Sequence, residues 1–440
     1  MIKMAELKAG TVLNTENGES LTIDSFIAEG GQGYVYKVTY KGQPRALKLY
    51  KPEAVKKLDW FHDNIREEIK VGALSDKFIW PEDLTVPINN TFGYIMPLKP
   101  PEYVDFDDIL LAKCELSSFY AMTNCALNIV SAFRLLHRKG YAYQDLNNGN
   151  FFIRLRDGDV LICDNDNVSP EDNPSGIAGK ARYMSPSVVM GGKPNRLTDR
   201  FSLAVCLFLL FIRCHPLEGV KALSVPEMND YYLQKHYGKE PLFIADPVDH
   251  SNGPNREIHR NFYLRWPLMT NTMKQLFTRT FSQEAMLQNE SKYPLEIEWC
   301  RALLQFRTYF FKCPLCEQET FLDSDPPICK CCGRQYPVLG MLKVNGVNGA
   351  HGYKIPLVKD ICIFREHLDD FSTTEQFVSQ PVGMVRTKIS EGTAGLSNIS
   401  NANWTYSIDG KSYTCAPKQT VKLRNGMTIR IGNRDVTVHM

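Results

Sequence analysis

The strongest constraint in the sequence is a glycine-rich segment placed between two strand-like runs. Residues 11–50 alternate apolar and polar residues, and this period of two predicts β-strands. The segment 28–35 interrupts the alternation with Gly30, Gly31 and Gly33. Glycine lets a backbone approach a ligand closely, and the N–H groups of such a loop suit phosphate oxygens. A plain glycine-rich hairpin turn fits the same residues, so this segment alone leaves two interpretations open.

A series of charged and polar residues follows the glycine segment at defined intervals. Lys48 ends a strand-like run, and Glu68 follows in the stretch 60–74, which has helical spacing. A second helix is expected over 115–138, and helices dominate from about 198 to 310. The later members of the series are Asp145, Asn150, Asp164, the segment 179–186 and Asp199. The pattern therefore predicts a strand-rich part followed by a helix-rich part.

The order and spacing of this series resemble the signature of eukaryotic-type protein kinases, over residues ~20 to ~310. The resemblance implies an α+β, bilobal protein-kinase-like fold. Its β-rich N-lobe would span 1–100 and its helical C-lobe 101–312. It also implies ATP and Mg²⁺ as cofactors, because phosphoryl transfer requires a protein mainly to position groups and neutralise charge.

The resemblance assigns nucleotide-binding roles to residues of the N-lobe. Gly30, Gly31 and Gly33 would cradle the phosphates. Lys48 would bind the α- and β-phosphates, and Glu68 would hold that lysine, with Glu67 as the alternative. Val35 and Ala46 would enclose the adenine, although both also fit ordinary strand core.

The C-lobe residues would carry the chemistry. Asp145 would orient the attacking hydroxyl and accept its proton. Asn150 and Asp164 would bind Mg²⁺ through oxygen atoms, the ligands that this hard cation prefers. Asp199 would brace the catalytic loop from below, although it could also be a simple charge at a helix start.

Several positions depart from the kinase pattern. Gln144 stands where an arginine usually receives a phosphorylated activation loop, so activity should not depend on that switch. Asn147 replaces a lysine that stabilises the transferring phosphoryl group, and we expect Lys180 to restore this cation; the alternative is a solvated loop charge. Asn165 replaces the aromatic residue of the metal motif, and Ser187 replaces a structural glutamate. These departures make a pseudokinase the alternative to an active enzyme.

Within protein kinases, the phrases at 140–153, 163–167 and 214–219 resemble a bacterial group. Its members are typically encoded beside a von Willebrand A-domain protein and a 2C-class phosphatase, as in tellurite-resistance-type phosphorylation triads. The resemblance implies a protein substrate, the von Willebrand A-domain protein being one candidate, and the phosphatase as antagonist.

Two cysteine pairs follow the kinase-like region. Cys313 and Cys316 precede Cys329 and Cys332 by a short loop, a spacing that suits four thiolates on a structural Zn²⁺. Cys331 is the spare cysteine. Residues 313–340 are too few for a core of their own, so a zinc ribbon would give them a fold. Unmetallated thiols are the alternative.

The last part, 341–440, shows short β-type runs between Gly/Asn turns and no evident helix. Its runs 395–405 and 421–432 resemble the second half of a forkhead-associated domain, a β-sandwich that reads phosphothreonine. His367 lies in a possible remnant of the first half. Asn398 and its neighbours could simply hold turns, and Trp404 is expected in the core.

Composition restricts the remaining options. The net charge of +2 gives no reason to expect nucleic acid or an anionic membrane as partner. The first ten residues lack the apolar core of a secretory signal, and the apolar run 201–212 is shorter than the ~20 residues of a bilayer span. We therefore expect a cytoplasmic chain with reduced cysteines.

Three functions compete on this evidence. The first is a Ser/Thr-type protein kinase of a bacterial signalling module that phosphorylates a protein substrate and itself. The second is a pseudokinase scaffold that assembles partners through residues 313–440. The third, transfer of the nucleotide itself, has the least support.

Overall fold

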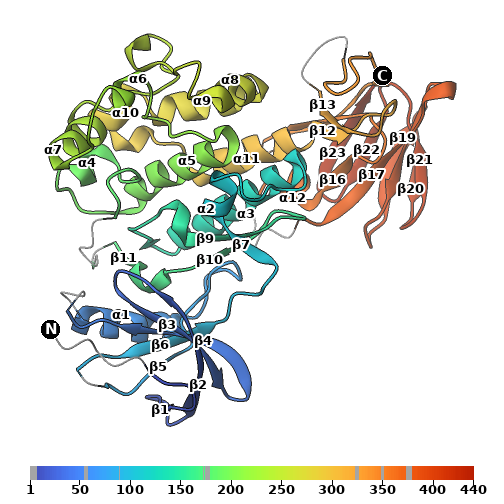
Figure 1. Ribbon diagram of the computed structural model, residues 1–440. Helices are drawn as coiled ribbons and strands as arrows, with labels where there is room; N and C mark the ends of the chain where they lie inside the picture. The colour runs from blue at the N-terminus through green and yellow to red at the C-terminus, as the bar shows by residue number, and fades with distance from the viewer. Residues whose placement is uncertain are drawn as a thin grey trace.

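The fold was analysed in a computed structural model, which describes residues 7–53, 58–88, 90–171, 173, 179–322, 327–347, 351–372 and 379–440. Figure 1 shows a β-rich lobe at the N-terminus, a helical lobe next to it, and a β-rich C-terminal part beside the helical lobe. The bilobal, kinase-like fold expected from the sequence is confirmed. Within these ranges no helix combines the length and the apolar character that crossing a bilayer requires.

The N-terminal lobe is an antiparallel sheet of six strands in the order β1-β2-β3-β4-β6-β5. Alternating residues of its strands, such as Leu21, Val38 and Leu47, are fully buried on one face. Helix α1 (Leu58–Val71) packs against this lobe with Phe61 and Ile65 buried. The strands are β1 (Val12–Asn14), β2 (Ser20–Glu29), β3 (Gly33–Tyr40), β4 (Gln43–Tyr50), β5 (Asp83–Leu84) and β6 (Gly93–Pro97).

The helical lobe is built around two buried helices, α3 (Phe119–Arg138) and α5 (Arg196–Ile212). Every residue of α5 from Phe201 onward is buried, so its apolar run is protein core. The other helices are α2 (Phe106–Leu110), α4 (Pro186–Val189), α6 (Val220–Leu223), α7 (Asp230–Leu233), α8 (Arg260–Arg265), α9 (Asn271–Thr280), α10 (Gln283–Leu287) and α11 (Glu296–Arg307). The small strands are β7 (Tyr103–Asp105), β8 (Tyr141–Ala142), β9 (Phe151–Arg154), β10 (Asp159–Ile162) and β11 (Ser169–Pro170).

The C-terminal part contains two antiparallel sheets, in the orders β15-β14-β23-β22-β19-β20 and β16-β17-β18-β21. A Cβ on Gly383 of one sheet would lie 3.1 Å from the ring of Trp404 in the other, so the sheets face each other closely. Its strands are β14 (Met341–Val344), β15 (Tyr353–Pro356), β16 (Cys362–Phe364), β17 (Pro381–Lys388), β18 (Thr393–Asn398), β19 (Trp404–Ile408), β20 (Lys411–Cys415), β21 (Thr420–Lys422), β22 (Thr428–Ile431) and β23 (Arg434–His439).

One expectation for this part was wrong. Residues 341–440 contain a helix, α12 (Arg365–Asp369), where none was evident in the sequence. The helix has only five residues, too few to show a helical period, and an ion pair of 3.4 Å joins its ends through Arg365 and Asp369. Tertiary contacts therefore decide its conformation.

The cysteine segment is attached to the helical lobe. Its hairpin pairs β12 (Phe310–Lys312) with β13 (Glu319–Phe321). The two Glu319 carboxylate oxygens accept hydrogen bonds from the backbone N–H groups of Phe119 and Tyr120, at 2.8 and 3.0 Å. These N–H groups are free donors of the first turn of α3, so Glu319 caps that helix with the charge its dipole favours.

Candidate active site

The glycine segment forms the turn between β2 and β3. The N–H of Gly30 donates to the carbonyl of Gly33 across the turn, at 2.9 Å. Lys51 Nζ also holds the turn, at 2.5 Å from Glu29 Oε1 and 2.9 Å from the carbonyl of Gly30. A Cβ on Gly33 would lie 2.5 Å from the carbonyl of Leu49, so glycine is required there by the neighbouring strand β4. The hairpin interpretation thus describes the geometry, and it is compatible with a phosphate-binding loop.

The two residues expected beside the adenine belong to one apolar cluster. Ala46 on β4 is buried in this cluster, and Val35 on β3 packs against it half-buried. Met96 of β6 and Phe152 of β9 contribute to the same cluster, so it joins both lobes. An apolar surface that spans both lobes is what a flat aromatic base would require.

Lys48 points from β4 to the loop that follows β10. Its ammonium lies 2.8 Å from Asp166 Oδ2 and 3.3 Å from Asp164 Oδ1. Burial alone would lower the pKa of Lys48, but the charges of Asp164 and Asp166 outweigh burial and raise that pKa above its ordinary value. Lys48 is therefore a permanent cation at this position.

Glu68 is buried on α1, while Glu67 is exposed and pairs with Lys70 at 2.6 Å. The inward-facing glutamate is thus the one expected. The expected contact is not formed, however: among the described residues, no hydrogen bond or ion pair joins Lys48 to Glu68. Glu68 Oε1 instead accepts a hydrogen bond of 2.7 Å from Asn64. Burial, and then the charge of Asp166, raise the pKa of Glu68 well above its ordinary value.

Asp145 lies in the loop between β8 and β9, close to the predicted metal ligands. The carbonyl of Asn150 accepts the N–H of Cys163 at 2.9 Å, which places Asn150 next to Asp164. Burial, and then the charge of Asp164, raise the pKa of Asp145 to about 6. The structure therefore brings the expected lysine and base together with Asp164, while the side-chain oxygen of Asn150 accepts the N–H of Asn147 at 2.7 Å.

Lys180 reaches the same loop from the other side. Its ammonium donates to Asn147 Oδ1 at 3.1 Å, and Asn147 Nδ2 lies 3.3 Å from Asp145 Oδ1. A Cβ on Gly179 would lie 2.6 Å from Asp145 Oδ1, so the segment passes directly over the carboxylate. A positive charge thus stands where Asn147 has replaced the usual lysine.

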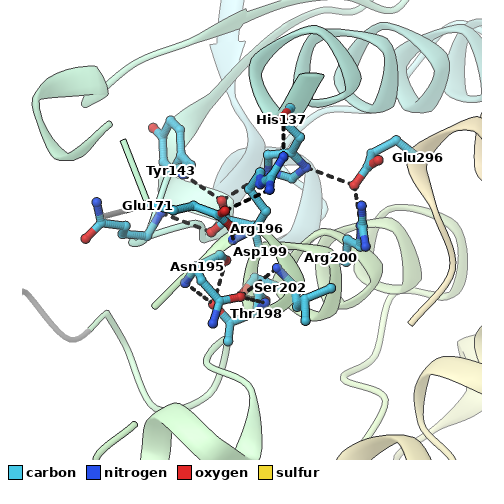
Figure 2. Close-up of polar contacts among 12 residues, drawn as sticks. His137, Tyr143, Glu171, Asn195, Arg196, Thr198, Asp199, Arg200, Ser202 and Glu296 are labelled. Atoms are coloured by element: carbon cyan, nitrogen blue, oxygen red, sulfur yellow. Dashed lines mark hydrogen bonds and ion pairs between the residues drawn. The ribbon is translucent and has the colours of Figure 1, made fainter. Parts of the chain in front are cut away.

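A buried charge network in the helical lobe holds this loop (Figure 2). Asp199 accepts the backbone N–H groups of Tyr143 and Gln144 at 2.6 and 3.0 Å. His137 lies 3.1 Å from Asp199 and 2.8 Å from Glu296, and Arg200 donates to Glu296 at 2.7 Å. The bracing position expected for Asp199 agrees with these contacts.

Two of the sequence departures have structural substitutes. Gln144 Nε2 donates to the carbonyl of Asn167 at 3.0 Å, which ties the catalytic loop to the metal loop without an arginine. Asn165 Nδ2 donates to the carbonyls of Ile79 and Ile162 at 2.7 and 3.0 Å. Both amides fix segments that an ion pair or an aromatic ring would otherwise hold.

The activation segment is anchored by a different ion pair. Arg182 binds Glu218 through two hydrogen bonds of 2.5 and 2.8 Å, and Tyr237 donates to the same carboxylate at 2.6 Å. Ser187, at the position of the usual glutamate, donates to Glu290 at 2.5 Å. The segment is therefore held without a phosphate.

Four cysteines form a candidate metal centre away from this site. The sulfurs of Cys313, Cys316, Cys329 and Cys332 all lie within 4.8 Å of one another. Cys331 is exposed and points to the carbonyl of Glu319, at 3.5 Å. A tetrahedral zinc with bonds of about 2.3 Å separates its sulfurs by roughly 3.8 Å, so this group fits the ion.

The C-terminal residues singled out from the sequence serve the β-fold itself. Asn398 is buried, donates to the carbonyls of Ala402 and Cys415, and accepts from Ser400. His367 is fully buried and accepts the N–H of Phe364 at 2.9 Å. Trp404 is buried in the core, as expected.

Sequence reasoning missed two residues of the site. Asp166 contacts Lys48, and Tyr50 donates a hydrogen bond to Asp166 Oδ2. The only sequence signal for Asp166 is its position two residues after Asp164, and Tyr50 shares the strand face of Lys48.

Comparisons with known proteins agree with this geometry. Residues 21–240 match the family described as protein kinase domain. The chain is 26% identical, over 53% of its length, to a probable LIM domain-containing serine/threonine-protein kinase of Dictyostelium discoideum, and 23% identical, over 45%, to a probable serine/threonine-protein kinase of Clostridium perfringens. The match spans 35% and 30% of those two relatives.

Among solved structures, the chain is similar to vaccinia related kinase 3, with a TM-score of 0.48 and 17% identity; the match covers 69% of this chain and 93% of that one. The family match alone covers half of the chain. The chain therefore belongs to the protein kinase domain family.

Proposed function

We propose that this protein is an active protein kinase of the Ser/Thr type, which transfers the γ-phosphate of Mg-ATP to a protein substrate and to itself. The observation that carries the proposal is the convergence of Lys48, Asp164 and Asp145, from three separate segments, on one place between the lobes. Protein kinase domains in general use ATP and Mg²⁺, and the names of the similar proteins support the Ser/Thr class.

Each residue has a physical task in this proposal. The turn with Gly30, Gly31 and Gly33 covers the phosphates, and Lys48 neutralises them. Asp145 takes the proton of the substrate hydroxyl, which its ionised form can do above a pH of about 6.

The metal ligands would be Asn150 and Asp164. Both offer oxygen atoms, and the half-exposed Asp164 carboxylate is open to a cation. The donor chemistry therefore fits Mg²⁺. When bound, the ion neutralises charge on the phosphates.

Lys180 supplies the cation that Asn147 lacks. Its contact with Asn147, 3.1 Å long, supports this role over a solvated loop charge. Lys180→Ala should abolish phosphoryl transfer while nucleotide binding persists. A fully active variant would refute the role.

The domain organisation proposed with this function has four parts: an N-lobe over 1–100, a C-lobe over 101–312, a zinc ribbon over 313–340 and a forkhead-associated-like β-module over 341–440. The four-sulfur group supports structural Zn²⁺ in the ribbon. His367 and Asn398 are buried and do not face a phosphate, so holding partners is the role that we propose for the β-module.

The proposed setting is a cytoplasmic bacterial signalling module. A von Willebrand A-domain protein is the candidate substrate, and a 2C-class phosphatase is the candidate antagonist. Both proposals rest on the resemblance of the sequences at 140–153, 163–167 and 214–219.

Labelled ATP tests the function directly. The wild-type chain with Mg²⁺ should label itself, and Asp145→Asn should not. A pseudokinase scaffold is the second candidate, favoured by Asn147 at the position of a catalytic lysine. Absence of label from both proteins, on themselves and on the candidate substrate, would support that alternative.

A further inference from the structure

The carboxylate that holds Lys48 comes from the loop after β10 and not from helix α1. Asp166 Oδ2 lies 2.8 Å from the Lys48 ammonium and also accepts a hydrogen bond from the Tyr50 hydroxyl. Asp166 is fully buried, and its other oxygen, Oδ1, has no hydrogen-bond partner in the described part of the chain. Lys48 and Tyr50 lie two residues apart on β4, so their side chains leave the same face of the strand. Both bind the one buried carboxylate.

Glu68, which the kinase pattern would place on Lys48, is engaged elsewhere. Asn64 Nδ2 donates to Glu68 Oε1 at 2.7 Å and to the carbonyl of Val168 at 2.8 Å. Glu68 Oε2 has no hydrogen-bond partner among the residues described. Through Asn64, this glutamate ties α1 to the segment after Asp166, which is a structural task.

Asp164 also contacts Lys48, but it differs from Asp166 in exposure. The Asp164 side chain is 48% exposed, and its contact with Lys48 is longer, at 3.3 Å. The Asp166 side chain is 0% exposed, and among the described residues Lys48 and Tyr50 donate hydrogen bonds to its carboxylate. A buried carboxylate needs such partners, because an unpaired charge in the interior is costly. Asp164 thus remains available to a cation, while the ion pair that Asp166 forms within the described ranges is with Lys48.

We propose that Asp166 positions Lys48 for the phosphates of the nucleotide, in place of Glu68. The proposal rests on the kinase function proposed above and names a positioning residue within that site. Asp166 acts through Lys48, since the contact is to the lysine. The opposite possibility is that Asp166 competes with the phosphates for Lys48, and the two make opposite predictions for nucleotide affinity.

Two matched variants test the proposal. Asp166→Asn and Glu68→Gln each replace a buried carboxylate on one side of Lys48 by an amide of the same shape. Dissociation constants are measured for ATP, ADP and adenosine, with and without Mg²⁺. Asp166→Asn should weaken ATP and ADP at least about tenfold, the equivalent of a lost hydrogen bond to a charged group, and leave adenosine unchanged. Glu68→Gln should stay within about twofold for all three.

Adenosine has no phosphates, so its dissociation constant distinguishes a positioning role of Asp166 from a structural one. Loss of affinity for adenosine equal to that for ATP would mean a structural role and would overturn the proposal. Unchanged or tighter binding of ATP by Asp166→Asn would show competition and would also overturn it. A larger effect of Glu68→Gln than of Asp166→Asn would return the role to Glu68.

Two further measurements keep the test decisive. In a Lys48→Met background, Asp166→Asn should change the ratio of ATP to adenosine affinity less than twofold, because the residue it acts through is gone.

If Asp166→Asn does not fold, Tyr50→Phe removes one hydrogen bond from Asp166 and should weaken ATP binding relative to adenosine binding by about threefold. No change would overturn the proposal. Phosphoryl transfer by the wild type is measured separately, so its absence would refute the kinase function without affecting this binding test.

Discussion

His137 Nε2 lies 3.1 Å from the carboxylate of Asp199, inside the helical lobe and next to the catalytic loop that Asp199 binds (Figure 2). Glu296 lies on the other ring nitrogen, at 2.8 Å. Burial disfavours the charged imidazole, but the hydrogen bonds and charges of Asp199 and Glu296 outweigh it and raise the pKa of His137 to about 9. A buried, charged histidine therefore supports the loop that carries Asp145.

The contacts of His137 with Asp199 and Glu296 predict that the free energy of unfolding falls at alkaline pH. The raised pKa of His137 gives a stabilisation that is fully present below about 6.5 and is lost as the pH rises through about 9. The free energy of unfolding of the wild type, relative to His137→Gln, should drop by on the order of 3 kcal/mol between pH 6 and 9.5. Denaturant unfolding measures it. His439→Gln, on an exposed residue, should show a constant difference, and a constant difference for His137→Gln would contradict the prediction.

The acid limb of the activity profile reports on Asp145. Burial and the charge of Asp164 raise its pKa to about 6, while Lys180 lowers it. Since the base must be ionised, kcat/KM should fall about tenfold per pH unit below about 6. Because Lys180→Met should be inactive, the pKa of Asp145 is followed in this variant by NMR titration of the carboxyl carbon, and it should lie above that of the wild type because a charge that favours the carboxylate is removed. Lys193→Met, on an exposed loop lysine, should leave this pKa in place; an unchanged pKa of Asp145 in Lys180→Met refutes the electrostatic link.

Zinc removal should destabilise the helical lobe as well as the ribbon. Glu319 lies in the hairpin that the four sulfurs fasten, and it caps α3. Cys316→Ser should lose the metal and lower Tm by at least about 5 °C, since structural zinc contributes folding energy. Metal analysis and thermal unfolding provide the measurements. Cys331→Ser is the matched control and should keep one zinc per chain; loss of metal from this variant would change the ligand assignment.

Activity should be independent of activation-segment phosphorylation. Gln144 offers no cation to a phosphate, and Arg182 is already bound to Glu218. Phosphatase treatment should leave kcat within about twofold, whereas Glu218→Gln should lower it roughly tenfold by releasing a charge-assisted pair. Glu227→Gln, on an exposed loop, serves as the control. A large loss of activity on dephosphorylation would show that another group reads the phosphate.

The sequence could predict those parts of the site that depend on chain spacing. Lys48, Asp145 and Asp164 stand at fixed distances along the chain, and the choice of Cys329 and Cys332 over Cys331 follows from their Cys-x-x-Cys spacing. The buried face of α1 separates Glu68 from Glu67 because its period is visible in the sequence.

The residues that sequence reasoning missed depend on side-chain direction in three dimensions. Whether Lys48 contacts Glu68 or Asp166 depends on how α1 and the loop after β10 lie relative to β4, and spacing does not encode that. Glu319 and Phe119 are 200 residues apart, so no local pattern marks the cap. The five residues of α12 are too few for a period.

The helical lobe and the two C-terminal sheets share one uninterrupted apolar interior, from Phe133 in α3 to Val438 in β23. Arg301 of α11 donates two hydrogen bonds to the carboxylate of Asp370, at 3.0 and 2.5 Å, and so joins the two parts. A shortened chain that ends at residue 312 would expose the apolar residues of the helical lobe that this cluster covers. Large exposed apolar surfaces promote aggregation. We therefore expect the kinase-like part to need residues beyond 312 for its solubility.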